Sequence, residues 1–441
     1  MSEVPRIKVL ESLNPVNSGT GEDVLAYNGL AEAVELYRLT NPERSNEVWD
    51  SELGSLDELS KARQLASEYL LKTALKVVGS NVANRDLWAG RFTLATSELY
   101  GEPEKVEATR LIVEEYTLLS QLQECSGISQ QPLQRLLATY EPIIIDTKPI
   151  ETEQQEAQTA LEHEKQAIAK YGEAIKDKYL PLFDLVDKAN KEKFSPSDLQ
   201  ELFSQALDWL KENDDPKWSE WSVEVKDGAS LSISAYKRKI EIAYRREAAS
   251  IKDTKGLIAH ELLVHALRAK NGYKTDDDKL ATGLPGYLDA EEGLGVLTEA
   301  AINGEIPDKA YDRYIDIALA LGVVDGIQRT RQELFQISYS RQLIRAELRG
   351  DTSILSSLVP RVWGHIDRIY RGGPGDNIGT RQAVFTKDIA YYVGYRQMAS
   401  YITEQLDNHK TALEVLAYLS QAKFDPTNDQ HLKRLAEVSN K

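Results

Sequence analysis

The chain has 441 residues, of which 41% are hydrophobic and 28% charged, and its formal net charge is −17. This composition allows a sizeable core, and the charge argues against binding nucleic acid or anionic lipid through bulk electrostatics. No run of about 18 apolar residues occurs, so we expect no membrane span. The single cysteine, Cys125, excludes an internal disulfide framework. Together with an N-terminus that has no secretory signal pattern, it predicts a cytoplasmic protein.

Helices are predicted over most of the chain by apolar residues that recur three and four positions apart. We expect an N-terminal arm over residues 1–50, followed by a helical region. The predicted helices in that region are 55–78, 87–100, 104–125, 132–137, 150–187 and 197–211. The range 150–187 is rich in Ala, Glu and Lys, which favours a long, largely solvated helix.

The pattern changes to strands between residues 221 and 244. Residues 221–225 and 231–235 alternate apolar and polar side chains, and Asp227-Gly228 between them is a hairpin signal. Residues 239–244 alternate in the same way. We predict one small sheet here, with residues 239–244 as an edge strand on which an extended peptide can lie.

The chain is again helical beyond residue 254. The predicted helices are 254–270, 290–303, 308–321, 326–349, 353–371, 387–406 and 410–421. We find no internal repeat. The predicted fold is therefore mainly α (α+β), with one small sheet just ahead of the helix that carries the most informative motif.

The motif is His260-Glu261, followed on the same apolar helix by His265. Zinc favours imidazole ligands, and a peptidase needs three protein ligands with a fourth position left for water. Glu261 can then act as the general base that takes a proton from the activated water. Taken alone, the pattern is equally compatible with two buried histidines and a capping glutamate.

The spacing of these histidines is unusual. Histidines four apart lie about 40° apart around an α-helix, whereas five apart they lie about 140° apart and do not converge on one ion. The metal hypothesis therefore predicts a π-type turn between His260 and His265. A third ligand is available in Glu292, which opens the next predicted helix after a loop rich in glycine and aspartate.

Several stretches resemble the microtubule-associated tyrosine carboxypeptidase family, whose bacterial members carry a Gln-Glu-Gly-Leu-Ala motif. They are His260 to Arg268, Tyr287 to Leu294, Arg91-Phe92, Leu99 to Pro103, Tyr370 to Gly373 and Phe385 to Asp388. The likeness extends over roughly residues 55–400. Glu291 stands where bacterial relatives often have Gln, and Gly295 where they have Ala.

The resemblance implies a helical, zincin-like metallopeptidase domain over residues 51–441. We expect a helical lobe over 51–215 and a lobe over 216–441 that holds the sheet and the zinc site. It implies that His260, His265 and Glu292 hold Zn²⁺ and that Glu261 is the base. It also implies carboxypeptidase action on a peptide or protein C-terminus. Characterised eukaryotic members act on tubulin tails, but the charge of −17 disfavours docking to an acidic filament.

A carboxypeptidase must bind a free terminal carboxylate, which suits an arginine fork or a lysine. Arg371 and Lys387 are candidates because both lie in family-like segments within residues 321–400, a stretch with 11 Lys and Arg against 7 Asp and Glu. Arg268, three residues past His265, is a third candidate. Structural ion pairs explain all three equally well. Tyr339 and Tyr391 are candidate donors to a developing oxyanion.

Three alternatives stay open from the sequence. One is a regulatory scaffold that binds metal without turnover, although the complete set of ligands and base speaks against it. Another is a metal-free helical interaction protein with its histidines in the core. A third is a zinc hydrolase that acts on a small amide. The substrate's identity and the oligomeric state are not determined by these patterns.

Overall fold

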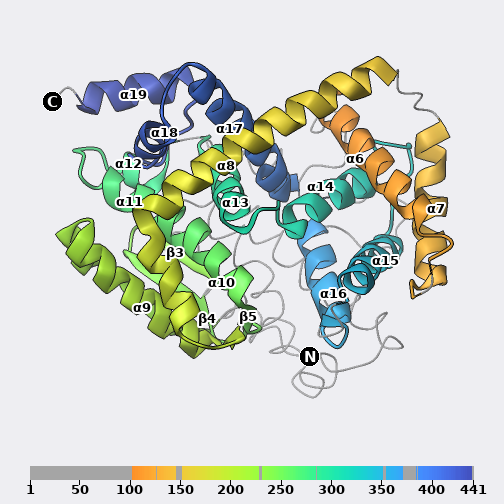
Figure 1. The fold of residues 1–441 in the computed structure, drawn as a ribbon, viewed down its shortest axis with the longest axis horizontal. Coiled ribbons are helices and arrows are strands. Elements are labelled where there is room, and N and C mark those ends of the chain that lie inside the picture. Colours follow the sequence, from red (N-terminus) through yellow and green to blue (C-terminus); the bar gives the residue numbers. More distant parts are fainter. Residues whose placement is uncertain are drawn as a thin grey trace, which may run out of the picture. The chain divides into compact units, whose positions relative to one another are not determined.

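The computed structural model describes residues 102–125, 127–145, 151–227, 231–284, 286–350, 354–370, 384 and 386–439. The expected arm over 1–50 and the helices predicted at 55–78 and 87–100 lie outside these residues. Within them the chain is mainly helical with two small sheets (Figure 1), which confirms the predicted fold class. None of the described helices is long and apolar enough to cross a membrane.

The chain forms two compact units, and each is built from two separate chain segments. Unit 1 consists of Met1–Pro149 and Asp312–Asp388, and unit 2 of Ile150–Tyr311 and Ile389–Lys441. Each lobe expected from the sequence, 51–215 and 216–441, is one continuous chain segment, whereas each unit combines two segments. Both units contain residues from each side of that expected boundary.

Unit 1 is helical in its described part. It contains α6 (Glu102–Gln121), α7 (Gln130–Ile145), most of α14 (Asp308–Leu321), α15 (Arg331–Arg349), α16 (Leu358–Ile369) and most of the 3₁₀ turn η7 (Thr386–Ile389). Helix α15 packs against both α7 and α16. The rings of Phe335 and Trp363 stack at the second contact, with centroids 4.5 Å apart. Aromatic burial of this kind stabilises the packing of helices.

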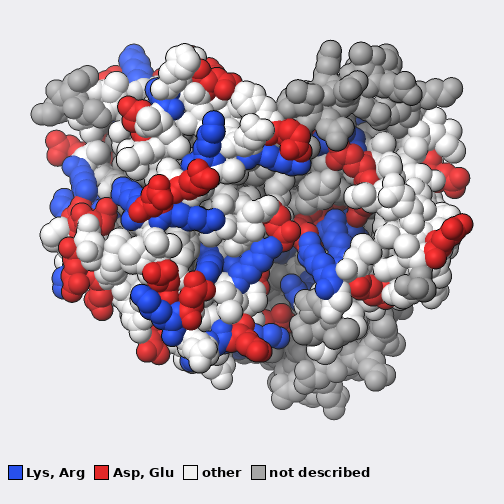
Figure 2. All heavy atoms as spheres, viewed as in Figure 1, with Lys and Arg blue, Asp and Glu red and all other residues white. Residues whose placement is uncertain are grey.

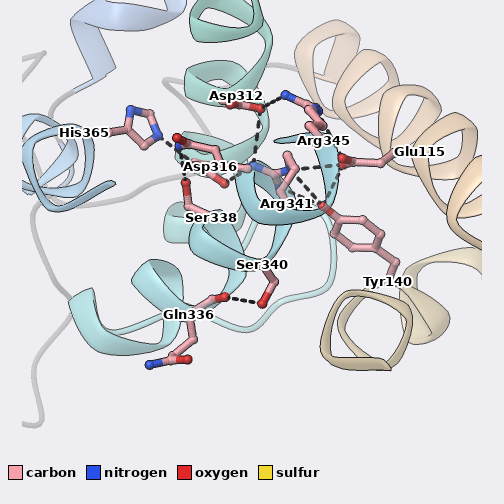
Figure 3. A network of polar contacts seen from close by, with 11 residues as sticks. Glu115, Tyr140, Asp312, Asp316, Gln336, Ser338, Ser340, Arg341, Arg345 and His365 are labelled. Carbon is pink, nitrogen blue, oxygen red and sulfur yellow. Dashed lines mark hydrogen bonds and ion pairs between the residues drawn. The ribbon is translucent and has the colours of Figure 1, made fainter. Parts of the chain in front are cut away.

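A buried network of charges joins the helices of unit 1 (Figure 3). The Arg341 guanidinium is 1% exposed and donates to Asp316 at 2.7 Å and to the Tyr140 hydroxyl at 2.7 Å. His365 Nε2 lies 2.8 Å from the other oxygen of Asp316. Arg345 donates to Asp312 at 2.6 Å. These arginines belong to the basic stretch noted in the sequence, and the structure shows that they pair within their own unit.

Asp316 gives a pH-dependent prediction. Burial raises the pKa of its carboxyl, but Arg341 and His365 outweigh this and lower the pKa to about 2. A carboxyl with a depressed folded-state pKa contributes stability that is complete above about pH 4 and is lost as the pH falls through about 2. The contribution is about 2 kcal/mol, since one pKa unit corresponds to about 1.4 kcal/mol.

We expect Asp316→Asn to remove this part of the pH dependence, because the amide does not titrate. Urea unfolding of both proteins between pH 5 and pH 2, followed by circular dichroism, measures it. The stability difference between wild type and variant should shrink as the pH falls. A difference that stays constant over this range would contradict the assigned pKa.

Unit 2 contains the predicted motif. Its helices are α8 (Glu151–Lys188), α9 (Pro196–Asn213), α10 (Ile251–Leu257), α11 (Leu267–Gly272), α12 (Lys279–Thr282), α13 (Leu288–Asn303), α17 (Ala390–Asp407), α18 (Ala412–Leu419) and α19 (Asp429–Ser439), with a π-helix η5 (Ile258–Ala266) and a 3₁₀ turn η4 (Pro216–Glu220). The helix predicted at 254–270 is therefore three consecutive elements. Helix α19 was not predicted from the sequence.

Helix α8 has the predicted length, but its second half is buried. Its second half carries Tyr171, Ile175, Leu182 and Phe183 into the core of unit 2, so the expectation of a largely solvated helix is wrong for this half. The helix is kinked where Tyr179 leaves helical geometry, two residues before Pro181. Proline removes a backbone donor and clashes with the preceding turn, which explains the kink.

The sheet has a different topology from the predicted hairpin. Strands β2 (Ser222–Lys226) and β3 (Ser232–Ser234) both pair with β4 (Lys239–Ala243), in the order β2-β4-β3. β2 runs parallel to β4, and β3 runs antiparallel to it. The hairpin expected at Asp227-Gly228 is therefore wrong, because β2 and β3 do not pair. The expectation of an edge strand at 239–244 is also wrong, since β4 is central and largely buried.

A second sheet of two short strands was not predicted. β1 (Lys193–Phe194) pairs antiparallel with β5 (Ala249–Ser250), which immediately precedes α10. Ser250 then caps α10, and its hydroxyl accepts from the backbone N–H of Asp253. This pairing fixes the start of the helix that carries the histidines.

Helix α13 lies at the centre of unit 2, where it packs against α8, α10, η5 and α17. Its contact with α17 is made backbone to backbone at two glycines. A Cβ added to Gly293 would lie 1.9 Å from the Gly394 carbonyl carbon, and one added to Gly394 would lie 1.8 Å from the Asp289 carbonyl oxygen. Both separations are far below van der Waals contact, so neither position accommodates a side chain.

We expect Gly394→Ala to destabilise unit 2 by about 3 kcal/mol or more, because the two helices would have to separate. Urea unfolding measures the loss. The control is Gly364→Ala in α16, where an added Cβ meets nothing within 4 Å. There alanine should change stability by about 1 kcal/mol or less, in the stabilising direction. Equal effects of both substitutions would contradict the close packing of α13 on α17.

Candidate metal centre

The two histidines of the motif lie on a π-helix. η5 spans Ile258–Ala266, and the backbone N–H of Leu267 donates to the carbonyl of Leu262, five residues earlier. This hydrogen bonding places residues five apart nearly one above the other. The rings of His260 and His265 have centroids 4.9 Å apart as a result. The π-type turn that the metal hypothesis required is therefore confirmed.

His260, His265 and Glu292 form a group that can hold a metal ion. All three are buried, and one ligand atom from each lies within 4.8 Å of the other two. Glu292 Oε2 is 3.8 Å from His260 Nε2 and 3.9 Å from His265 Nε2. Two ligands about 2.1 Å from one ion at a tetrahedral angle lie about 3.4 Å apart, so these separations are close to those required.

A charged network orients the His265 ring. His265 Nδ1 lies 2.9 Å from Glu291 Oε1, and Glu291 is ion-paired with Arg268 and with Lys423 Nζ at 3.1 Å. Burial raises the pKa of Glu291, but Lys423, Arg268 and His265 hold it well below its usual range. The ionised carboxylate favours a proton on Nδ1, which leaves the Nε2 lone pair directed at Glu292.

A second carboxylate stands behind His260. Glu299 Oε2 lies 3.5 Å from His260 Nδ1, an electrostatic contact rather than a hydrogen bond. Burial raises the pKa of Glu299, but Lys309, 3.0 Å away, and His260 lower it to about 2. On the other side of the ring, a Cβ at Gly295 would lie 2.6 Å from Nε2. The backbone of α13 therefore forms one wall of the site.

These residues fit a metal ion. Burial lowers the pKa of the His265 imidazole even though Glu291 opposes the shift, and the neutral form that results is the form that binds metals. A carboxylate behind each ring is the arrangement that raises the basicity of metal-binding histidines. The buried Nδ1 of His260 has no hydrogen-bond partner among the described residues. A small shift of the ring toward Glu299 would satisfy that atom.

Glu261 lies on η5 directly after His260 and is half-buried, whereas the three candidate ligand residues are buried. It is therefore the accessible carboxylate of the motif.

Arg268 is 1% exposed, and its guanidinium donates to Glu291 and to the carbonyls of Ala422 and Phe424. The Arg268 guanidinium, a candidate for binding substrate, is therefore hydrogen-bonded to acceptors within the protein.

The structure describes the positions of two of the other candidate residues, Tyr391 and Tyr339. Tyr391 is buried in the core of unit 2 on α17. Tyr339 belongs to α15 in unit 1, where its ring stacks on Phe335 with centroids 5.8 Å apart. Arg371 lies outside the described residues, as does the side chain of Lys387. Their roles in binding substrate stay predictions.

Four charged residues that interact with the candidate site or with its neighbours were missed by sequence reasoning, namely Arg246, Glu299, Lys309 and Lys423. Glu299 follows Glu292 by seven positions, which is two helical turns, so helical spacing could have placed it on the same face. Lys423 comes from a loop more than 100 residues further along the chain. Nothing local in the sequence connects it with Glu291.

A family comparison agrees with this site. Residues 154–311 match the family model of microtubule-associated tyrosine carboxypeptidase. The matched segment covers nearly all of the first segment of unit 2 and includes all three ligand residues and Glu261. The resemblance inferred from the motifs is therefore confirmed for this part of the chain. No match was found among curated proteins or solved structures.

Two substitutions at Glu291 distinguish its hydrogen bond to His265 from its ion pairs with Arg268 and Lys423. Glu291→Leu removes the acceptor behind His265, and we expect metal affinity to fall about 10- to 100-fold. Glu291→Gln keeps an acceptor for His265 but leaves Arg268 and Lys423 without their carboxylate. It should retain metal better than Leu while losing about 3 kcal/mol of stability in the metal-free protein. Competition with a chromophoric chelator, together with urea unfolding, measures both. Wild-type metal affinity in the Leu variant would contradict the orienting role.

Proposed function

We propose that this protein is a zinc-dependent carboxypeptidase that removes the last residue of a peptide or protein. The observation that carries the proposal is the convergence of His260 and His265 with Glu292 of α13. Glu261 lies beside the two histidines on their π-helix. Two imidazoles and one carboxylate are a common ligand set for catalytic zinc. The family match supports action at a C-terminus.

The chemistry divides between the ion and Glu261. Zinc, when bound, supplies a Lewis acid that lowers the pKa of water and polarises a carbonyl. The Glu261 carboxylate accepts the proton of the attacking water and then delivers it to the leaving amine, as a general base and then a general acid. Its partial exposure supports this role, because it must meet both water and substrate.

The substrate backbone needs a strand edge near the metal centre. β3 is an edge of the β2-β4-β3 sheet, and it lies against η5. We propose that an extended peptide pairs with Ser232–Ser234, in place of the β4 strand expected from the sequence. Backbone pairing of this kind binds a chain without demanding particular side chains. Selectivity then depends on the residue beyond the cleaved bond.

Tyrosine is the first residue to test at the C-terminus, because the matching family is described as a tyrosine carboxypeptidase. The net charge of −17 disfavours strongly acidic partners. A neutral hexapeptide that ends in tyrosine is therefore a better first substrate than an acidic tail. The proposal requires neither nucleic acid nor membrane.

The test combines metal content with hydrolysis. We expect about one zinc per wild-type chain by elemental analysis, and its loss in His265→Ala and Glu292→Ala. Glu261→Gln should keep the zinc and lower kcat on the hexapeptide about 100- to 10,000-fold. The matched control is His163→Ala, since His163 is exposed and its ring pairs only with Asp407 among the described residues.

The outcomes distinguish the alternatives. Wild-type protein that takes up no metal even after incubation with zinc would refute the proposal and indicate a metal-free interaction protein. Stoichiometric zinc without hydrolysis of any peptide would indicate a regulatory scaffold. Cleavage of small amides but not of peptides would indicate a different hydrolase.

A further inference from the structure

Arg246 lies on the short connection between the sheet and the histidine helix. β4 ends at Ala243, and the backbone N–H of Arg246 donates to the Ala243 carbonyl at 3.2 Å. Three residues later the chain enters β5, whose pairing with β1 leads into α10 and η5. The backbone of Arg246 is thus held at both sides by hydrogen-bonded structure.

The guanidinium of Arg246 has no partner among the described residues. Its Nε is buried and makes no hydrogen bond, and no ion pair or other hydrogen bond of the side chain occurs in the described part of the chain. Leaving a buried donor unsatisfied costs about 1–3 kcal/mol, and more for a charged group. A polar group kept at this cost indicates an acceptor that the protein itself does not supply.

Neighbouring cations are paired, which makes Arg246 distinctive. Arg245 pairs with Asp227, Lys252 with Glu305 and Lys255 with Asp187. On the face shown in Figure 2, basic side chains lie against acidic ones over much of the surface. Arg268 is bonded to Glu291, as described above. Among the described residues, Arg246 therefore differs from these neighbours in having no protein acceptor for its guanidinium.

Two carboxylates of the metal site are among the charges that act on Arg246. Burial lowers its pKa, and the carboxylates that oppose this are led by Glu261, followed by Asp253, Glu299 and Glu247. Glu261 and Glu299 belong to the metal site, so the guanidinium lies within electrostatic range of the proposed base and of the carboxylate behind His260. It nevertheless forms no ion pair with either.

We propose that Arg246 binds the terminal carboxylate of the substrate, a proposal that rests on the carboxypeptidase function. When the scissile carbonyl is at the metal centre, the terminal carboxylate is one residue away, or about 3.5 Å further along the chain. Arg246, whose charge is influenced most by Glu261 among the neighbouring carboxylates and which has no acceptor among the described residues, is our candidate for that position. The planar guanidinium can donate two parallel hydrogen bonds to a carboxylate, whereas a C-terminal amide offers it no charge and one acceptor oxygen.

The experiment compares ligands that differ only at that group. The hexapeptide ending in tyrosine is used as the free acid and as the amide, and kcat/KM is measured for both. Binding of tyrosine and of tyrosinamide to the zinc-loaded full chain is measured by calorimetry, which needs no turnover. Arg246→Gln and Arg246→Lys are compared with Arg245→Gln, a neighbouring arginine that is exposed and already paired.

We expect Arg246→Gln to lower kcat/KM about 100-fold for the free acid, mainly through KM, and to leave the amide nearly unchanged. It should abolish the preference for tyrosine over tyrosinamide, while zinc content stays at the wild-type value and the unfolding midpoint does not fall. Arg246→Lys should restore part of the preference, because it keeps the charge but not the fork. Arg245→Gln should behave as wild type.

The failures of the two proposals are distinguishable. If the protein hydrolyses peptides but Arg246→Gln loses acid and amide substrates equally, the carboxylate assignment is wrong and the carboxypeptidase function stands. If no peptide is cleaved yet tyrosine binding depends on Arg246, the carboxylate site stands and the peptidase function fails. If wild type binds neither tyrosine nor either peptide, both are overturned.

Discussion

The number of residues between His260 and His265 constrains the whole metal centre. On an α-helix the two imidazoles would point about 140° apart, so they could not share an ion with Glu292. The π-helix over Ile258–Ala266 removes that difference. π-helical turns are rare and occur frequently at functional sites. Here the short β1–β5 pairing and the close packing of α13 hold the segment in place.

Helix α13 supplies most of what surrounds the two rings. Glu292 faces both Nε2 atoms, Glu291 lies behind His265, and Glu299 lies behind His260. Because one helix carries all three carboxylates, a shift of that helix would disturb every contact at once. The glycine contact with α17 restricts such a shift, since the two backbones already touch. The packing of α13 on α17 therefore also determines the geometry of the candidate metal site.

Charge is distributed so that each carboxylate behind a histidine has its own cation. Arg268 and Lys423 neutralise Glu291, and Lys309 neutralises Glu299. Buried ion pairs of this kind do little for net stability but fix geometry when every group is satisfied. Arg268, a candidate for binding substrate in the sequence, is used in this way. The Arg246 guanidinium, by contrast, has no acceptor among the described residues.

The sequence by itself determined the mainly helical class, the candidate histidines and the π-type turn that a shared metal ion would require. These depend on local periodicity and on the chemistry of residue types, both of which are written in consecutive positions. Only the tertiary structure decided which strand is central, since alternation predicts a strand but not its neighbour. It also decided which cations are used internally, because partners such as Lys423 and Glu291 lie far apart in the chain and meet only when α13 and the C-terminal segment pack together.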